Sequence, residues 1–256
     1  MNTPFTYEFG YSWSIGWGYV VPLALFGGLA AVAWRLRWRT WLVAVPGLIA
    51  IWSLAAIVLI QVVLGINLPQ PIFVPQFLAS GFGEALDVGA GSGRSTVGLL
   101  LARPGVRVTA IDIYNGYYGI DDNTPQRLMA NARTAGVADR ATVEVGDARA
   151  MPLPSSTYDG VISSYAIDHI QRNDIPKALS EVARVLKPRG EFLLMLVNVD
   201  LWALLLAPPM AHHPRAEPQR WRTLLESAGL EVLEQGTHPL TLYFYARKGA
   251  DAGASR

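Results

Sequence analysis

The sequence predicts an α/β fold preceded by two membrane helices, and three features of the 256-residue chain support this prediction. The first third contains almost no charged residues. The remainder alternates short apolar runs with amphipathic segments, as expected for strands and helices of a mostly parallel sheet. A glycine-rich turn at residues 89–93 follows the first of these runs. We therefore expect a helical membrane segment joined to a doubly wound domain.

Composition narrows the possible functions. Charged residues make up 16% of the chain and its net charge is +1, against about 25% charged residues in an average soluble protein. Nucleic acid is not expected as a partner, because the chain has no basic run beyond three spaced arginines near residue 37. The chain has no cysteine, which excludes disulfides, thiolate metal sites and a cysteine nucleophile.

Residues 1–66 are expected to form a membrane-anchoring helical hairpin. Its two uncharged segments, about 11–34 and 41–66, are each longer than the roughly 20 residues needed to cross a bilayer. Tryptophans and tyrosines gather toward the segment ends, as at membrane interfaces. A cleaved signal peptide is disfavoured, because the amino terminus carries no Lys or Arg and the apolar stretch is too long. A buried apolar hairpin within a soluble fold is the remaining alternative.

Three prolines and no charge in residues 67–83 predict an extended linker along the membrane surface. A domain over 84–248 and a flexible tail over 249–256 follow. The domain begins with a predicted strand at 84–89, a helix at 92–102 and a strand at 106–112. The glycine turn between the first strand and the helix suits a ligand that approaches backbone N–H groups.

Asp112 ends the second strand, where such folds direct a carboxylate at ribose hydroxyls. Dinucleotide-binding proteins share this scheme, but their G-x-G-x-x-G fingerprint requires glycine at the position of Arg94. An NAD-dependent membrane oxidoreductase is therefore disfavoured.

The segment LDVGAGSG at 86–93 resembles motif I of class I methyltransferases, which use S-adenosylmethionine (SAM). Segments that resemble later motifs of the same family follow in order at 146–148, 158–164 and 186–194. The resemblance therefore spans about 84–248. It implies a Rossmann-like seven-stranded sheet of order 3-2-1-4-5-7-6, with its last strands near 231–234 and 240–247. SAM is the implied cofactor. The implied cofactor-binding residues are Asp87, Gly89, Ala90, Gly91, Gly93, Asp112, Ile113, Asp147, Ala148, Ser163 and Ser164.

SAM already carries an activated methyl group, so the protein must mainly align the acceptor and exclude water. A base is needed only for an acceptor with a tightly held proton. His169, just after the fourth predicted strand, is the candidate base, and Asp168 would orient it. A packing or capping role for both residues is the alternative. The aromatic stretch 114–118, with Asp121 and Asp122, is expected to cover the cofactor or shape the acceptor pocket.

The run LWALLLAPPM at 201–210 is expected to dip into the bilayer beside the active site. His212 and His213 follow it without partners at metal-ligand spacing, so no metal site is predicted.

The sequence favours a membrane-anchored methyltransferase acting on a small lipophilic acceptor, such as a quinone precursor, a lipid headgroup, a thiol or another hydrophobic metabolite. The prolines typical of nucleic-acid amino methyltransferases are missing at 163–166. A protein methyltransferase and a non-catalytic SAM-binding scaffold or sensor stay open. The oligomeric state is not predicted.

The orientation in the membrane involves a conflict. Arg35, Arg37 and Arg39 lie between the two apolar segments, and no other Lys or Arg precedes Arg94. The positive-inside rule would place this turn in the cytoplasm and the domain outside, if both segments span. SAM is made in the cytosol, so we expect an integral membrane protein with a cytoplasmic catalytic domain.

Overall fold

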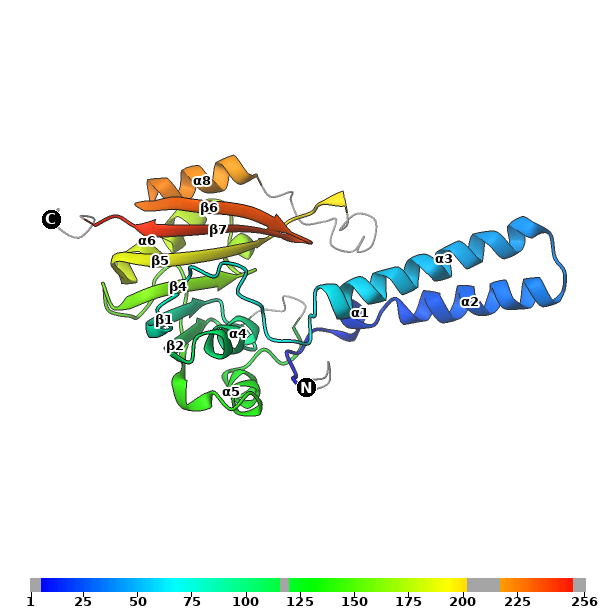
Figure 1. Cartoon of the computed structure of the whole chain (residues 1–256), viewed down its shortest axis with the longest axis horizontal. Coiled ribbons are helices and arrows are strands. Elements are labelled where there is room, and N and C mark those ends of the chain that lie inside the picture. The colour runs from blue at the N-terminus through cyan, green and yellow to red at the C-terminus, as the bar shows by residue number, and fades with distance from the viewer. Residues whose placement is uncertain (1–5, 116–119, 202–216, 251–256) are drawn as a thin grey trace.

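The computed structural model describes residues 6–115, 120–201 and 217–250. A long helical hairpin projects from one side of an α/β domain (Figure 1). Several predicted features lie outside the described residues: the apolar run 201–210 after Leu201, His212 and His213, part of the aromatic stretch at 114–118, and the end of the tail.

The hairpin consists of α1 (Trp13–Gly16), α2 (Val20–Arg35) and α3 (Thr40–Val58), which a π-helical turn, η1 (Leu59–Val63), extends. The helix predicted for 11–34 is interrupted, because the chain turns between α1 and α2, where Gly16 and Gly18 lower helix propensity. The continuous helix Thr40–Val63 has 24 residues and is long and apolar enough to cross a membrane. Helix α2 has 16 residues, so only the second predicted segment reaches the spanning length.

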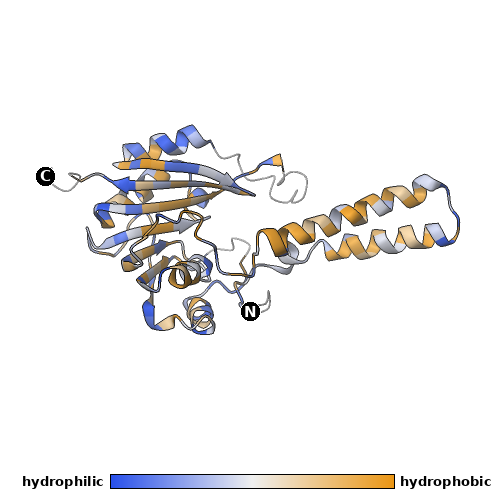
Figure 2. Cartoon of the chain, viewed as in Figure 1, coloured by the Kyte–Doolittle hydropathy of each residue, from blue (hydrophilic) through white to orange (hydrophobic). Residues whose placement is uncertain are grey.

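Packing within the hairpin is the reverse of packing in a water-soluble protein. The buried face of α3 carries small or polar side chains: Pro46, Ala50, Ser53 and Ala56. Its outward face carries large apolar side chains: Leu48, Ile51, Leu54 and Val58. Figure 2 shows this apolar character along both helices. Small residues between helices and large apolar residues outside are typical of helices that pack within lipid.

The domain is built on one seven-stranded sheet of order β3-β2-β1-β4-β5-β7-β6, which confirms the predicted order. The strands are β1 (Phe82–Val88), β2 (Gly105–Asp112), β3 (Ala141–Val145), β4 (Tyr158–Ser164), β5 (Leu186–Val197), β6 (Leu230–His238) and β7 (Thr241–Lys248). Strands β1 to β5 are parallel, and β7 runs antiparallel to both β5 and β6. Their carboxyl ends therefore meet at one edge, where ligands of such sheets bind.

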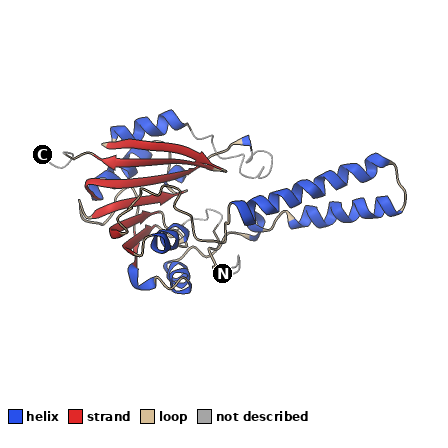
Figure 3. Ribbon diagram, in the orientation of Figure 1, coloured by secondary structure: helices blue, strands red, loops and turns tan. Residues whose placement is uncertain are grey.

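Helices cover both faces of the sheet (Figure 3). Helices α4 (Arg94–Ala102) and α5 (Pro125–Thr134) lie on one face, and α6 (Ile175–Val185) and α8 (Pro218–Ser227) lie on the other. Two short 3-10 turns, η2 (Ala138–Arg140) and η3 (Ile167–His169), complete the described elements. Helix α6 buries apolar side chains at spacings of three and four residues, as its amphipathic sequence predicts.

Residues 67–83, where the prolines and lack of charge predicted an extended linker along the membrane surface, pack partly into the domain. Val74, Phe77 and Leu78 are buried in the core on the α4 side of the sheet. The Arg103 side chain at the end of α4 donates hydrogen bonds to the backbone carbonyls of Phe77 and Pro75, at 2.9 and 2.8 Å. The apolar residues between the prolines thus make this segment part of the domain.

Candidate functional site

The glycine turn after β1 forms the centre of the site. Gly89, Gly91 and Gly93 have φ angles of 74°, 52° and 89°, a region that disfavours residues with a Cβ. A Cβ on Gly89 would also lie 2.1 Å from the Cβ of Ala166, which follows β4. The close approach of these two loops therefore requires glycine at position 89. It brings the turn after β1 against the segment that carries the candidate catalytic residues.

Asp112, the predicted ribose ligand, lies at the end of β2 and against the glycine turn. Its Oδ2 accepts a hydrogen bond from the Gly91 N–H at 2.9 Å. Its Oδ1 accepts one from the Tyr114 N–H at 2.8 Å. The carboxylate thus holds the turn in place, and each oxygen retains a second lone pair for a ligand.

Three buried polar atoms around the turn have no partner among the described residues: Asp87 Oδ1, Tyr114 Oη and Asn123 Oδ1. The other oxygen of Asp87 accepts hydrogen bonds from the Ser95 and Thr96 hydroxyls at 2.7 and 2.6 Å. Unpartnered buried polar atoms are costly unless a ligand satisfies them. Such a cluster is typical of a ligand-binding site.

The electrostatics of this cluster favour a cation. Burial, with a smaller contribution from the nearby Asp112 carboxylate, raises the pKa of Asp87 to about 6, although the two hydroxyl hydrogen bonds oppose the shift. Burial also raises the pKa of the Tyr114 phenol, and both carboxylates add to that shift. SAM carries a sulfonium and an ammonium group, so the residues present fit the cofactor that the sequence implies.

This raised pKa makes SAM affinity dependent on pH. A bound cation favours the ionised form of Asp87, so below pH 6 binding must first remove a proton from this carboxyl group. We expect affinity to fall about tenfold between pH 7 and pH 5, measured by calorimetry. Asp87→Asn should bind SAM more weakly at pH 7 and lose this dependence. An unchanged pH dependence in Asp87→Asn would show that another group is responsible.

Other predicted cofactor residues lie along the same edge but have protein partners. Asp147, after β3, forms an ion pair with Arg149 at 2.6 Å, and its hydrogen bond with this arginine lowers its pKa. Ser163, at the end of β4, donates a hydrogen bond to the Val88 carbonyl at 2.9 Å and so joins β4 to β1. Ala148 and Ser164 follow Asp147 and Ser163 in sequence, and Ile113 follows Asp112. Contacts of these residues with SAM stay predictions.

His169 and Asp168 lie together in η3, just beyond β4. Asp168 Oδ2 accepts a hydrogen bond from the Val197 N–H at 2.8 Å, and its Oδ1 lies 3.3 Å from His169 Nδ1. The Asp168 carboxylate and the Tyr165 backbone carbonyl raise the pKa of His169 more than burial lowers it. A larger share of the imidazole is then protonated at neutral pH, which weakens its fitness as a base. Asp168 thus contacts the His169 ring, and the catalytic role of the pair stays a prediction.

Sequence reasoning missed a side-chain contact at this edge. The Tyr165 hydroxyl lies 2.5 Å from Thr241 Oγ1, which joins the end of β4 to the start of β7. Tyr165 has a φ of 54°, an uncommon value for a non-glycine residue. Neither residue belongs to a motif, so no local sequence signal could have identified this pair. Within the described ranges, no group of three or more His, Asp or Glu residues could hold a metal ion.

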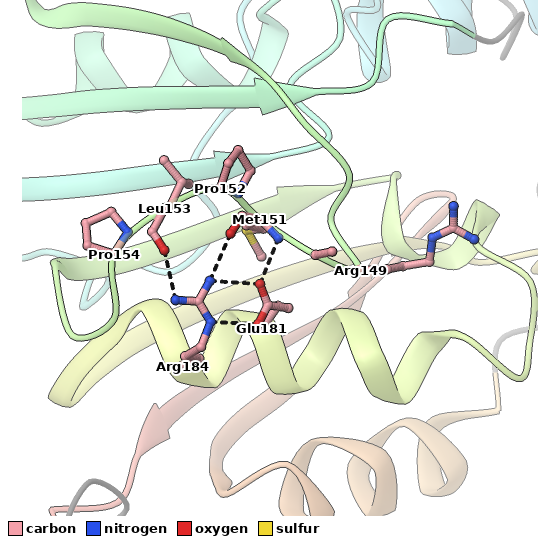
Figure 4. A pocket seen from close by; sticks show the side chains of 8 residues that line it. Arg149, Met151, Pro152, Leu153, Pro154, Glu181 and Arg184 are labelled. Carbon is pink, nitrogen blue, oxygen red and sulfur yellow. Dashed lines mark hydrogen bonds and ion pairs between the residues drawn. The ribbon is translucent and has the colours of Figure 1, made fainter.

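A shallow surface depression of about 590 Å³ lies apart from the glycine turn, between the loop after β3 and helix α6 (Figure 4). Arg184 of α6 donates hydrogen bonds to the carbonyls of Met151 and Leu153, at 3.0 and 2.8 Å. It also pairs with Glu181, whose carboxylate accepts the Met151 N–H at 2.7 Å. The polar groups here hold the loop against α6, so we assign this depression a structural role.

Comparison with known proteins agrees with the geometry. Residues 85–190 match a family model described as a methyltransferase domain. A demethylmenaquinone methyltransferase from Symbiobacterium thermophilum is 33% identical over 109 residues, which cover 42% of this chain and 40% of that protein. A ubiquinone/menaquinone biosynthesis C-methyltransferase from Cereibacter sphaeroides is 34% identical over 112 residues, covering 44% and 41%. The match thus spans about two fifths of the length of these curated relatives.

Solved structures show the same fold. An O-methyltransferase family 2 protein from Planctomyces limnophilus has a TM-score of 0.54 at 18% identity, covering 80% of this chain and 70% of that one. A SAM-dependent methyltransferase from Methanosarcina mazei has a TM-score of 0.53 at 19% identity, covering 66% and 93%. Both similarities concern the architecture alone.

Proposed function

We propose, on the premise that this chain contains a class I SAM-dependent methyltransferase domain, that the whole protein is an integral membrane enzyme that methylates a small lipophilic acceptor. Among the lipophilic acceptors, we favour a quinone precursor. Support comes from the names of the two similar proteins, a demethylmenaquinone methyltransferase and a ubiquinone/menaquinone biosynthesis C-methyltransferase. The apolar hairpin beside the site supports an acceptor of comparable lipophilicity.

The observation that carries the proposal is the buried acidic cluster at the glycine turn. Asp87, Asp112, Tyr114 and Asn123 present oxygen atoms there, and three of these atoms have no partner among the described residues. Asp112 would hold the ribose, and the unpartnered Asp87 oxygen would face a positive group. SAM supplies an activated methyl group when bound. The chain's own residues position it and keep water out.

His169 and Asp168 are the proposed catalytic pair for an acceptor that must lose a proton. Asp168 holds the imidazole at the carboxyl end of β4, next to the loop that contacts Gly89. Because the pKa of His169 is raised, the share of imidazole able to accept a proton grows as pH rises through that pKa. If the pair acts as a base, turnover should therefore rise with pH over a range shifted upward from that of a free imidazole.

Membrane insertion is supported by the packing of the hairpin. Ile51 and Leu54 of α3 are 65% and 51% exposed, and a continuous apolar surface of this kind is unstable in water. We place the domain in the cytoplasm, where SAM is made. The arginines between α2 and α3 would then extend to headgroups of the opposite leaflet, because long basic side chains can reach the interface from helix ends.

Single-cysteine labelling tests this orientation, because the chain has no cysteine of its own. Ser180→Cys on α6 and Leu36→Cys at the hairpin tip are both at exposed positions. In intact spheroplasts, a membrane-impermeant maleimide should label position 36, and should label position 180 only after lysis. Labelling at position 180 in intact spheroplasts would place the domain outside.

The activity is tested with the full chain in phospholipid nanodiscs that contain demethylmenaquinone, using SAM with a radiolabelled methyl group. We expect label in the extracted quinone, and none with Gly89→Ala, whose Cβ would collide with Ala166. Label in protein alone would identify a protein methyltransferase. SAM binding without any transfer would favour a scaffold or sensor.

A further inference from the structure

The segment that leads into the hairpin is bound to the glycine turn. The Phe9 carbonyl accepts a hydrogen bond from the Ser92 hydroxyl at 2.6 Å, and the Phe9 side chain is fully buried. The Asn131 side chain of α5 pairs with the N–H and the carbonyl of Glu8, at 2.9 and 3.0 Å. Asn131 also donates a hydrogen bond to the Ser92 carbonyl at 3.0 Å. We call residues 7–12 the entry leg.

The segment that leaves the hairpin, residues 64–70, is bound to Arg94 and forms the exit leg. The Arg94 guanidinium donates hydrogen bonds to three backbone carbonyls and to one side-chain oxygen. These acceptors are Leu64 O at 2.8 Å, Gly65 O at 3.1 Å, Leu68 O at 2.9 Å and Gln70 Oε1 at 2.5 Å. A Cβ on Gly98 would lie 2.0 Å from the Gln70 carbonyl, so glycine at this position of α4 lets the exit leg approach the helix.

The two attachment points flank a single residue of the glycine turn at 89–93, which is the proposed cofactor turn. Ser92 and Arg94 lie on either side of Gly93, the residue that caps the amino terminus of α4. The base of the hairpin is also closed, because Gln61 of η1 donates a hydrogen bond to the Gly16 carbonyl of α1 at 2.6 Å and accepts one from Asn67 of the exit leg at 3.1 Å. Figure 1 shows the hairpin leaving the domain from this place.

The hairpin base also contacts the carboxyl end of β5 and the start of β7. Leu59 and Leu64 pack with Val199, which follows β5, and with Leu240, which precedes β7. The cofactor turn and the carboxyl end of β5 thus hold the same short piece of the hairpin. A flexible connection between a membrane anchor and a catalytic domain would show no such contacts.

We propose that Ser92 and Arg94 are positioning residues that fix the membrane hairpin to the cofactor turn. They thereby set the orientation of the methyl-donor site relative to the bilayer. This inference rests on the proposed function, which places the hairpin in a membrane and the methyl donor at the glycine turn. It adds that the turn holding the methyl donor and the membrane anchor form one rigid unit, so that a lipophilic acceptor meets the donor at a fixed height.

The test is a spin-label distance measurement on the full chain in nanodiscs. Labels at Leu36→Cys and Ser180→Cys report the hairpin tip and the far face of the domain. We expect a narrow distance distribution in the otherwise unchanged chain and at least a twofold broader one in Arg94→Gln. Arg94→Lys keeps the charge with fewer directed donors and should give an intermediate width. Ser92→Ala should broaden the distribution less, because Asn131 still holds Glu8.

Arg103→Gln is the matched control. Arg103 binds the same returning segment through Phe77 and Pro75, but beyond the exit leg. It should lower the melting temperature without broadening the distribution, which separates positioning from general stability. An unbroadened distribution in Arg94→Gln, or equal broadening in Arg103→Gln, would overturn the inference. If Arg94→Gln does not fold, Arg94→Lys decides by the same criterion.

Failure of the proposed function is distinguishable from failure of this inference. Absence of the protein from the nanodisc fraction would contradict membrane insertion. The distance measurement can then be repeated in detergent, where the contacts of Ser92 and Arg94 predict the same narrow distribution.

Discussion

Asp112→Ala is expected to lower SAM affinity about 100-fold, which corresponds to about 3 kcal/mol. The substitution removes the carboxylate that would face the ribose. It also frees the Gly91 and Tyr114 N–H groups that this carboxylate accepts at 2.9 and 2.8 Å. The glycine turn then loses its side-chain hydrogen bond to the end of β2. Calorimetric titration of the detergent-purified protein with SAM measures the effect.

Asp139→Ala is the control for this experiment, because Asp139 is an exposed aspartate in η2, away from the turn. It should bind SAM as the unchanged protein does. Wild-type affinity in Asp112→Ala would place the cofactor elsewhere on the sheet edge.

A pair of aspartates on the outward face of α3 is expected to abolish membrane insertion. Ile51→Asp and Leu54→Asp place two charges near the middle of the helix Thr40–Val63. Each aspartate at the centre of a membrane helix costs about 3 kcal/mol on insertion scales, so the pair costs about 6 kcal/mol. The double variant should leave the membrane pellet on alkaline carbonate washing, whereas the unchanged protein should stay.

The matched control adds the same two charges to the domain. Val145 and Leu233 are 63% and 42% exposed, close to the 65% and 51% of Ile51 and Leu54. Val145→Asp with Leu233→Asp should stay in the pellet. Retention of the α3 double variant would mean that the hairpin does not hold the protein in the membrane.

The sequence predicted what depends on local pattern. The glycine turn is predicted by the glycines and the aspartate in 86–93, together with Asp112. The sheet that is observed is predicted by strand-like runs in the order of the family. The short α2 was not predicted, because apolar composition continues through Gly16 and Gly18 although the helix does not.

Other features depend on contacts between distant residues. The segment 67–83 was interpreted as a linker, because proline content does not reveal that Phe77 is buried against the domain. The pairing of Phe9 with Ser92 joins residues 83 positions apart. The raised pKa of His169 depends on how its side chain lies beside Asp168 and Tyr165. The local sequence does not determine this arrangement.

The entry leg has a consequence for the order of events during synthesis. Its partner Asn131 lies 123 residues after Glu8, beyond both helices of the hairpin. Domains fold as the chain emerges from the ribosome, so the hairpin can enter the bilayer well before this contact can form. The entry leg is therefore translated long before it can reach its native place. An amino-terminal fusion that delays their docking would leave the domain folded but its cofactor turn incompletely supported.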